Sequence, residues 1–144
     1  MKKLFKESKY FQDWLKKARR DFETAFLNHR HGGYTDVTCY FCHQVAEKSL
    51  KAYLLYKGIK SLPKTHILPS LLALCTEEEK SFSELKSDGE ILDGYYIEAK
   101  YPPILSVDYS KKEAKGALDK AEKIFKFVSK KIKPEKIYTQ LTGI

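Results

Sequence analysis

The chain has 144 residues and a formal net charge of +8, with 42% hydrophobic and 13% aromatic residues. These values indicate one globular domain that buries a core without disulfides or a metal, and they exclude a disordered chain. No apolar run approaches the roughly 20 residues that span a bilayer, and no apolar stretch of signal-peptide type follows the basic start. We therefore expect a cytoplasmic protein, not a membrane protein, with its three cysteines as reduced thiols.

Two long amphipathic helices are predicted in the first part of the chain. Apolar side chains recur at steps of three and four over residues 10–28, and Gly32 and Gly33 end that helix. The same spacing predicts a second helix from about Thr35 to Lys57, closed by Gly58.

Shorter elements are predicted next. Apolar spacing indicates a short helix over residues 67–75, and the capping-box pattern of residues 76–79 would restart the chain as helix. A fourth helix is predicted around residues 92–99. It ends before Pro102 and Pro103, which cannot donate backbone hydrogen bonds, so an extended loop should run to Asp108.

A last long helix is predicted from the capping box that Ser110 opens to the stop at Pro134. No segment alternates with the period of two that strands require. Short loops between amphipathic helices favour antiparallel neighbours. The fold class is therefore predicted as all-α, an antiparallel up-and-down bundle of about five helices, with one domain over residues 1–136 and a tail over residues 137–144.

The positive charge lies at the two ends of the sequence. Residues 1–20 hold eight basic and two acidic side chains, and residues 111–136 hold ten basic and four acidic ones, so each segment has a net charge of +6. Residues 21–110 carry −4. If the first and last helices are neighbours, they form one basic surface, which would either attract nucleic acid or an acidic protein, or only keep the chain soluble.

A polar stripe on the second predicted helix is the most informative feature. Its members share one helix face because they are three, four and seven residues apart: Gln44, Glu47, Lys48 and Lys51. The rest of this helix is mostly apolar, which is typical of a central helix in a bundle. The stripe is then either a solvated face or the lining of a cleft or interface, where its lysines would attract a phosphate.

The segment Cys39-Tyr40-Phe41-Cys42-His43 matches the C-x-x-C-H attachment pattern of c-type haem. Haem of this type is attached outside the cytosol, and the sequence shows no export signal. The usual axial methionine is also missing, because Met1 is the only methionine. A zinc site would need a second ligand pair with suitable spacing. We therefore interpret the two cysteines as packed thiols on a helix, and we expect no cofactor or metal.

Two further candidates lie outside the stripe. Lys100 and Tyr101 place a cation and an aromatic ring where the fourth predicted helix ends, and they would either pack there or stack a base and contact a phosphate. His66 begins the third predicted helix, where it serves either as a cap or packing residue or as a functional group. No Gly-rich phosphate loop and no nucleophile elbow are present.

Three segments in a fixed order carry a resemblance to a known family. They are residues 43–52 (H-Q-V-A-E-K-S-L-K-A), residues 66–72 (H-I-L-P-S-L-L) and residues 98–102 (E-A-K-Y-P), preceded by Trp14, Ala18, Asp21 and Ala25. This combination resembles the HEPN domain family, the small helical domains of higher eukaryotes and prokaryotes. In that family the second helix reads Q-x-A-E-K-x-L-K-A, followed by H-x-L-x-x-L and A-R-Y-P. The resemblance covers about residues 8–132.

The resemblance implies a prokaryotic five-helix bundle that forms a homodimer, is often encoded beside a minimal nucleotidyltransferase, and binds nucleotides. It also implies a site in which three lysines (Lys48, Lys51 and Lys100) contact phosphate, Tyr101 stacks and Gln44 donates a hydrogen bond. Glu47 and His66 belong to the same set of ligand-binding candidates.

Some members of the family are RNases, including toxins of toxin–antitoxin pairs, with an arginine followed four to six residues later by a histidine. This sequence departs from that pattern. Lys100 replaces the common arginine, and no histidine follows it. Metal-free RNA cleavage needs such a base and such a cation, so the resemblance favours a non-catalytic nucleotide-binding module. Two alternatives remain: an RNase toxin with a degenerate site, and a purely structural dimerisation subunit.

Overall fold

The computed structural model describes residues 2–96 and 108–132, with side chains from Tyr10 onward. Within these residues it has helices and no strand, as the sequence predicts. The elements are α1 (Lys2–Arg30), α2 (Thr35–Tyr56), α3 (Leu68–Glu78), the 3-10 helix η1 (Lys80–Leu85), α4 (Lys86–Asp93) and α6 (Lys111–Lys131). None of these helices has the length and apolar content that a membrane crossing requires.

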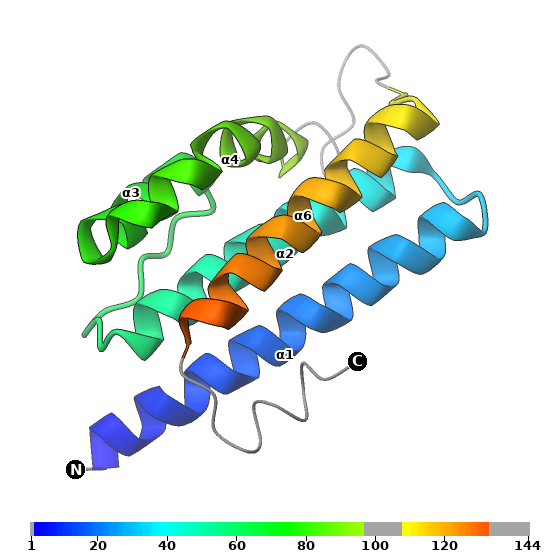
Figure 1. Ribbon diagram of the computed structural model, residues 1–144. Coiled ribbons are helices and arrows are strands. Elements are labelled where there is room, and N and C mark those ends of the chain that lie inside the picture. The colour runs from blue at the N-terminus through cyan, green and yellow to red at the C-terminus, as the bar shows by residue number, and fades with distance from the viewer. Residues whose placement is uncertain (1, 97–107, 133–144) are drawn as a thin grey trace.

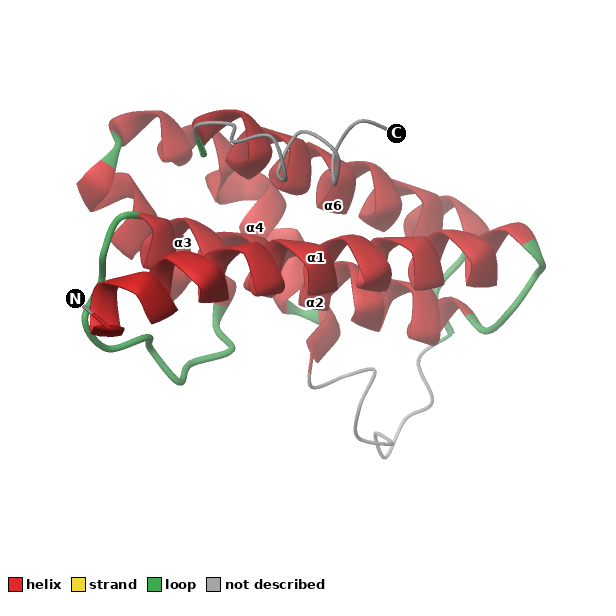
Figure 2. Ribbon diagram, turned by 90° about the horizontal axis from the view of Figure 1, so that it is seen from below, coloured by secondary structure: helices red, strands yellow, loops and turns green. Residues whose placement is uncertain are grey.

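The helices form an up-and-down bundle with α2 at its centre (Figure 1). Helix α1 runs one way, and α2 returns beside it. Helix α4 folds back beside α3, so that Asp93 meets Leu68, and these two helices with η1 between them form the broken third leg. Helix α6 runs parallel to α2. Helix α2 packs against all the other α-helices. Seen from below, α1 and α2 again lie side by side (Figure 2). The predicted fold class is therefore confirmed.

The turn between α1 and α2 follows from local chemistry. Gly32 has a positive φ of 73°, which favours glycine, and Gly33 donates its backbone N–H to the Asn28 carbonyl at 2.7 Å. The Asn28 amide in turn donates to the Tyr34 carbonyl and to the Thr38 hydroxyl, both at 2.8 Å. The predicted stop at the two glycines is confirmed. Helix α1 begins earlier than predicted, at Lys2.

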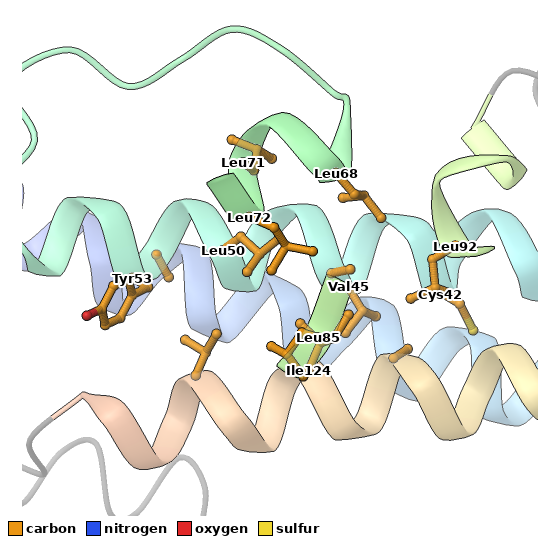
Figure 3. Packing of buried hydrophobic residues seen from close by; sticks show 14 of the residues in the cluster. Cys42, Val45, Leu50, Tyr53, Leu68, Leu71, Leu72, Leu85, Leu92 and Ile124 are labelled. Carbon is orange, nitrogen blue, oxygen red and sulfur yellow. The ribbon is translucent and has the colours of Figure 1, made fainter. Parts of the chain in front are cut away.

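The core is built around α2, and buried side chains of α1, α6 and the broken third leg pack against it (Figure 3). Helix α6 faces α2 with small and branched side chains, among them Ala114, Ala117 and Ala121, which let the two backbones approach closely. The predicted cap of α6 is confirmed, because the Ser110 hydroxyl accepts the Glu113 N–H at 3.0 Å. The Glu113 carboxylate does not complete a capping box; it accepts the Tyr95 hydroxyl at 2.8 Å.

The third leg differs from its prediction in two places. Thr76 does not start a helix: it lies inside α3 and donates its hydroxyl to the Leu72 carbonyl at 2.7 Å, and the chain continues as η1. Of the helix predicted around residues 92–99, Tyr95 and Tyr96 are helical, and residues 97–99 lie outside the described residues. A helix that the sequence did not predict, α4, precedes it over Lys86–Asp93. Apolar spacing missed this helix because Gly89, without a side chain, is the residue that packs against Leu72.

Candidate functional site

The polar stripe of α2 is largely buried and is not a solvated face. Glu47 and Lys51 are only 3% and 4% exposed, whereas Gln44 and Lys48 are partly buried. The reason is the central position of α2, which leaves little of its surface to solvent. Each of these polar groups has a partner, as a buried polar group requires.

Glu47 is the hub of the stripe. Its Oε2 atom accepts hydrogen bonds from Lys51 Nζ and from His66 Nδ1, both at 2.9 Å, and its Oε1 atom accepts the Gln44 amide at 3.3 Å. Burial pushes the pKa of Glu47 upward, but the hydrogen bonds from Lys51 and His66 outweigh it, and the pKa lies below its ordinary value of 4.5. Glu47 is therefore a buried, ionised carboxylate at neutral pH.

His43, fully buried, adds a second layer to this hub. Its Nε2 atom lies 3.0 Å from the His66 carbonyl, which only accepts, so Nε2 carries the proton. Its Nδ1 atom then accepts the Gln44 amide at 3.1 Å. Burial lowers the pKa of His43 below 6.5, which agrees with this neutral tautomer, although Glu47 and Asp93 oppose the effect.

His66 is held at both its backbone and its side chain, yet its side chain is 50% exposed. His43 binds its carbonyl, Glu47 binds Nδ1, and the Tyr96 ring stacks on the imidazole at 4.9 Å with an angle of 15° between the planes. The opposite nitrogen, Nε2, points away from Glu47 because of the shape of the ring. His66 thus offers a fixed, accessible imidazole edge.

The first residues of α3 contact the surroundings of His43 and His66. Ile67 at its N-cap makes no side-chain cap, and the Leu68 N–H is instead bound by Asp93 Oδ1 from α4 at 2.8 Å. Asp93 Oδ1 also lies 3.8 Å from His43 Nε2. The segment that carries His66 is therefore fixed from α2 and from α4.

Lys48 faces α1 and forms an ion pair with Asp21. Lys51 also reaches α1, because its Nζ atom lies 5.5 Å from the centre of the Trp14 ring. The two lysines of the stripe are thus charge-compensated, one by Asp21 and one by Glu47. Lys100 and Tyr101 lie outside the described residues.

The two cysteines of the C-x-x-C-H segment pack in the hydrophobic core. Cys39 and Cys42 are both 0% exposed, and burial raises the pKa of Cys39 to about 12 and raises that of Cys42 as well. Within the part of the chain that the structure describes, no group of three potential ligands is arranged to hold a metal ion. The prediction of packed thiols is confirmed by their burial.

Sequence reasoning missed several members of the site. His43 was noticed in the haem-like pattern and in the segment that carries the resemblance, Trp14 as an apolar position and as part of the resemblance, and Tyr96 only as an apolar position, but none of them was predicted as a site residue. Tyr96 carries no sequence signal for its contact with His66, since 30 positions along the chain separate the two. The sequence offers one indication that His43 belongs to the site, because it directly precedes Gln44, the first residue of the polar stripe.

The HEPN domain model matches residues 11–132, which is most of the chain. The chain belongs to the HEPN domain family. No curated protein matches the sequence.

Two solved structures share this HEPN fold. The protein TT1696 from Thermus thermophilus is 33% identical with a TM-score of 0.75, over 84% of this chain and 97% of that one. ST0689, described as an archaeal HEPN homologue, is 26% identical with a TM-score of 0.69, over 85% and 98% of the two chains. The segments 43–52 and 66–72, which carried the resemblance in the sequence, meet in this HEPN domain through the contacts of Glu47 and His43 with His66.

Proposed function

We propose that this HEPN domain is a non-catalytic nucleotide-binding module that acts as a homodimer together with a minimal nucleotidyltransferase. The observation that carries the proposal is the contact between Glu47 and His66. A buried carboxylate holds an exposed imidazole in one orientation, an arrangement that a merely solvated helix face does not need. The proposal treats residues 1–136 as the working domain and residues 137–144 as a tail.

The ligand-binding residues of the proposal are Gln44, Glu47, Lys48, Lys51, His66, Lys100 and Tyr101. The described members have distinct roles in it. His66 meets the ligand, Glu47 and Gln44 orient His66, and Lys48 and Lys51 supply positive charge between α1 and α2. Lys100 and Tyr101 would add a cation and a stacking ring.

Isothermal titration calorimetry with ATP and with GTP tests the nucleotide role. We expect saturable binding that weakens about 10- to 150-fold in His66→Ala, because a charge-assisted hydrogen bond contributes about 1.5–3 kcal/mol. His31→Ala is the matched control, since His31 is exposed at the turn after α1. No heat signal with either nucleotide up to millimolar concentration would refute the nucleotide role.

The same contact favours one alternative, a degenerate RNase. A carboxylate that holds Nδ1–H of an imidazole leaves Nε2 to act as a general base, as RNA cleavage requires. If the domain is an RNase toxin, its expression alone slows growth and fragments RNA, and His66→Ala abolishes both effects. Normal growth with intact RNA would count against this alternative.

The second alternative is a structural subunit. Its support is the apolar surface near the α1–α2 turn, where Phe26, Leu27, Tyr34 and Val37 are 43%, 53%, 82% and 36% exposed. If the stripe serves assembly only, Lys48→Ala combined with Lys51→Ala disrupts assembly and leaves nucleotide affinity unchanged.

A further inference from the structure

A groove of about 540 Å³ lies along α3, η1 and the first residue of α4. This volume is within the range of about 300–1,000 Å³ that is typical of ligand pockets. The lining residues come from positions 69–77 of α3 and from positions 80–86, which follow it in the chain. No residue of the proposed function lines this groove.

One wall of the groove is a mostly apolar face of α3. Its residues are three, four and seven positions from the first of them, so they lie on one side of an α-helix. They are Pro69, Leu72, Ala73 and Thr76. The Thr76 hydroxyl is already used as a donor, since it binds the Leu72 carbonyl at 2.7 Å. This wall therefore offers a ligand apolar contact.

The other wall is a basic row along η1. A 3-10 helix has three residues per turn, so side chains at positions i and i+3 lie in one row. Lys80, Ser83 and Lys86 have this spacing over η1 and the first residue of α4, and all three line the groove. With a rise of about 2 Å per residue, the row is about 12 Å long.

The apolar surface between the walls is preformed. Phe82 is 0% exposed, and its ring centroid lies 4.5 Å from that of Tyr53 and 4.9 Å from that of Phe127. Leu72 packs directly against Gly89. Because Phe82 is the one aromatic residue among those that line the groove and is fully buried, the groove offers no ring face for stacking. Its apolar surface suits an aliphatic chain.

The basic row lacks a counter-charge. Lys80 and Lys86 are exposed, and within the described part of the chain neither forms an ion pair. Two acidic residues close to them in the sequence, Glu79 and Asp88, pair instead with lysines of α6. Glu77 is the one carboxylate among the lining residues, so the groove has two cations for one anion.

These charges are unevenly placed along the groove. Lys80 follows Glu77 by three residues at the end of α3, whereas Lys86 begins α4, which folds back beside α3 (Figure 1). Gly89, one turn further along α4, meets Leu72. Lys86 is therefore the cation beside the apolar wall, away from the carboxylate.

We propose that this groove binds a small aliphatic carboxylate, of the medium-chain fatty-acid class. The chain lies between the α3 wall and Phe82, and the carboxylate accepts hydrogen bonds from the Lys86 ammonium and the Ser83 hydroxyl. This site goes beyond the proposed function and shares no residue with it.

Calorimetric titration of decanoate, kept below its micellar concentration, into the full-length protein tests the proposal. We expect saturable binding to one site, and none by decylammonium, which has the same chain and the opposite charge. Lys86→Glu should bind decanoate about tenfold or more weakly, because a repulsive charge replaces an attractive donor. A glutamate is compatible with this first residue of α4, since acidic groups are favourable at a helix N-terminus.

Lys112→Glu is the matched control, because Lys112 is exposed on α6 and does not line the groove. A second pair of variants tests the apolar wall. Ala73→Trp should block the groove and abolish binding, whereas Ser70→Trp, at an exposed position of α3 outside the groove, should bind like the wild type. His66→Ala should also bind decanoate normally.

Three results would overturn the proposal. They are the absence of saturable decanoate binding, equal binding of decylammonium, and equal affinities within both pairs of variants. Because Lys86 and Ala73 are exposed, their substitution does not threaten folding. The result is independent of nucleotide binding, since an excess of ATP should leave the decanoate affinity unchanged.

Discussion

At the scale of single residues, Glu47 is the group on which the candidate site depends. It is a buried anion whose charge is matched by Lys51 and whose second partner, His66, comes from another part of the chain. Removing one partner of a buried ion pair leaves the other charge without compensation, which costs far more than breaking a surface pair. The stability of the domain and the position of His66 are therefore coupled through one carboxylate.

Glu47→Gln should lower the free energy of unfolding by about 3–5 kcal/mol, because Lys51 then remains buried without a counter-charge. Urea denaturation measures the loss. Glu122→Gln is the control, since Glu122 pairs with Lys126 on the surface of α6 with both side chains exposed. It should change stability by less than about 0.5 kcal/mol. Equal effects of the two substitutions would contradict the role of Glu47 as a buried hub.

His43 should make stability depend on pH. Its folded pKa lies below 6.5 because the residue is buried, so on acidification the unfolded chain takes up a proton before the folded chain does. The stability contributed by neutral His43 is present above pH 6.5 and is lost as the pH falls below that value. Glu47, with its lowered pKa, adds a further loss only below 4.5.

Unfolding free energies measured between about pH 7.5 and about pH 5.5 should therefore fall with pH in the wild type and fall less in His43→Gln, which cannot titrate. Glutamine retains a donor for the His66 carbonyl. His31→Gln, at an exposed position, should keep the wild-type slope. Identical slopes in all three proteins would contradict the assignment of His43 as a buried neutral imidazole.

At the scale of elements, the broken third leg shows how packing decides where a helix lies. A Cβ atom added to Gly89 would lie 2.3 Å from Leu72 Cδ1, so α4 approaches α3 more closely than any other residue would allow. Gly116 in α6 differs, because its nearest neighbour is Lys120 Nζ at 3.7 Å. A Gly→Ala substitution should therefore destabilise the domain at Gly89 and stabilise it at Gly116.

Gly89→Ala should destabilise the domain by about 1–2 kcal/mol, since overpacking outweighs the gain in helix propensity. Gly116→Ala should stabilise it by about 0.5–1 kcal/mol, since only the propensity changes. Thermal or urea unfolding distinguishes them. If Gly89→Ala stabilises the domain as much as Gly116→Ala does, the close α3–α4 approach is refuted.

At the scale of the whole molecule, the two basic segments of the sequence become neighbours, because α1 packs against α6. The lysines of α6 are partly neutralised. Lys123 pairs with Asp88 and Lys131 with Glu79, while Lys115 and Lys126 pair within the helix. This pairing favours a solvated, lysine-rich surface over a dedicated binding face for nucleic acid.

The proposed homodimer belongs to this scale as well. The apolar surface near the α1–α2 turn suits a second copy of the chain, so Leu27→Asp combined with Val37→Asp should convert a dimer into a monomer. Size-exclusion chromatography with light scattering measures the mass. Ile91→Asp, at a similarly exposed apolar position on α4, should leave the mass unchanged. A monomeric wild type would refute the dimer.

The sequence alone determined most of the helices. The ends of α2 and the Ser110 cap of α6 were predicted to within a residue, because apolar period, glycine stops and capping hydroxyls act locally. It also determined that Gln44, Glu47, Lys48 and Lys51 share one face, since helix geometry is enough to place them.

Only the tertiary structure decided what that face contacts. The stripe turned out to be largely buried, because α2 is surrounded by its neighbours. Glu47 meets His66, Lys48 meets Asp21, and Lys51 reaches Trp14, all through contacts between elements far apart in the sequence. Such contacts depend on how the loops return the chain and on how side chains fill the core, and no local pattern encodes either.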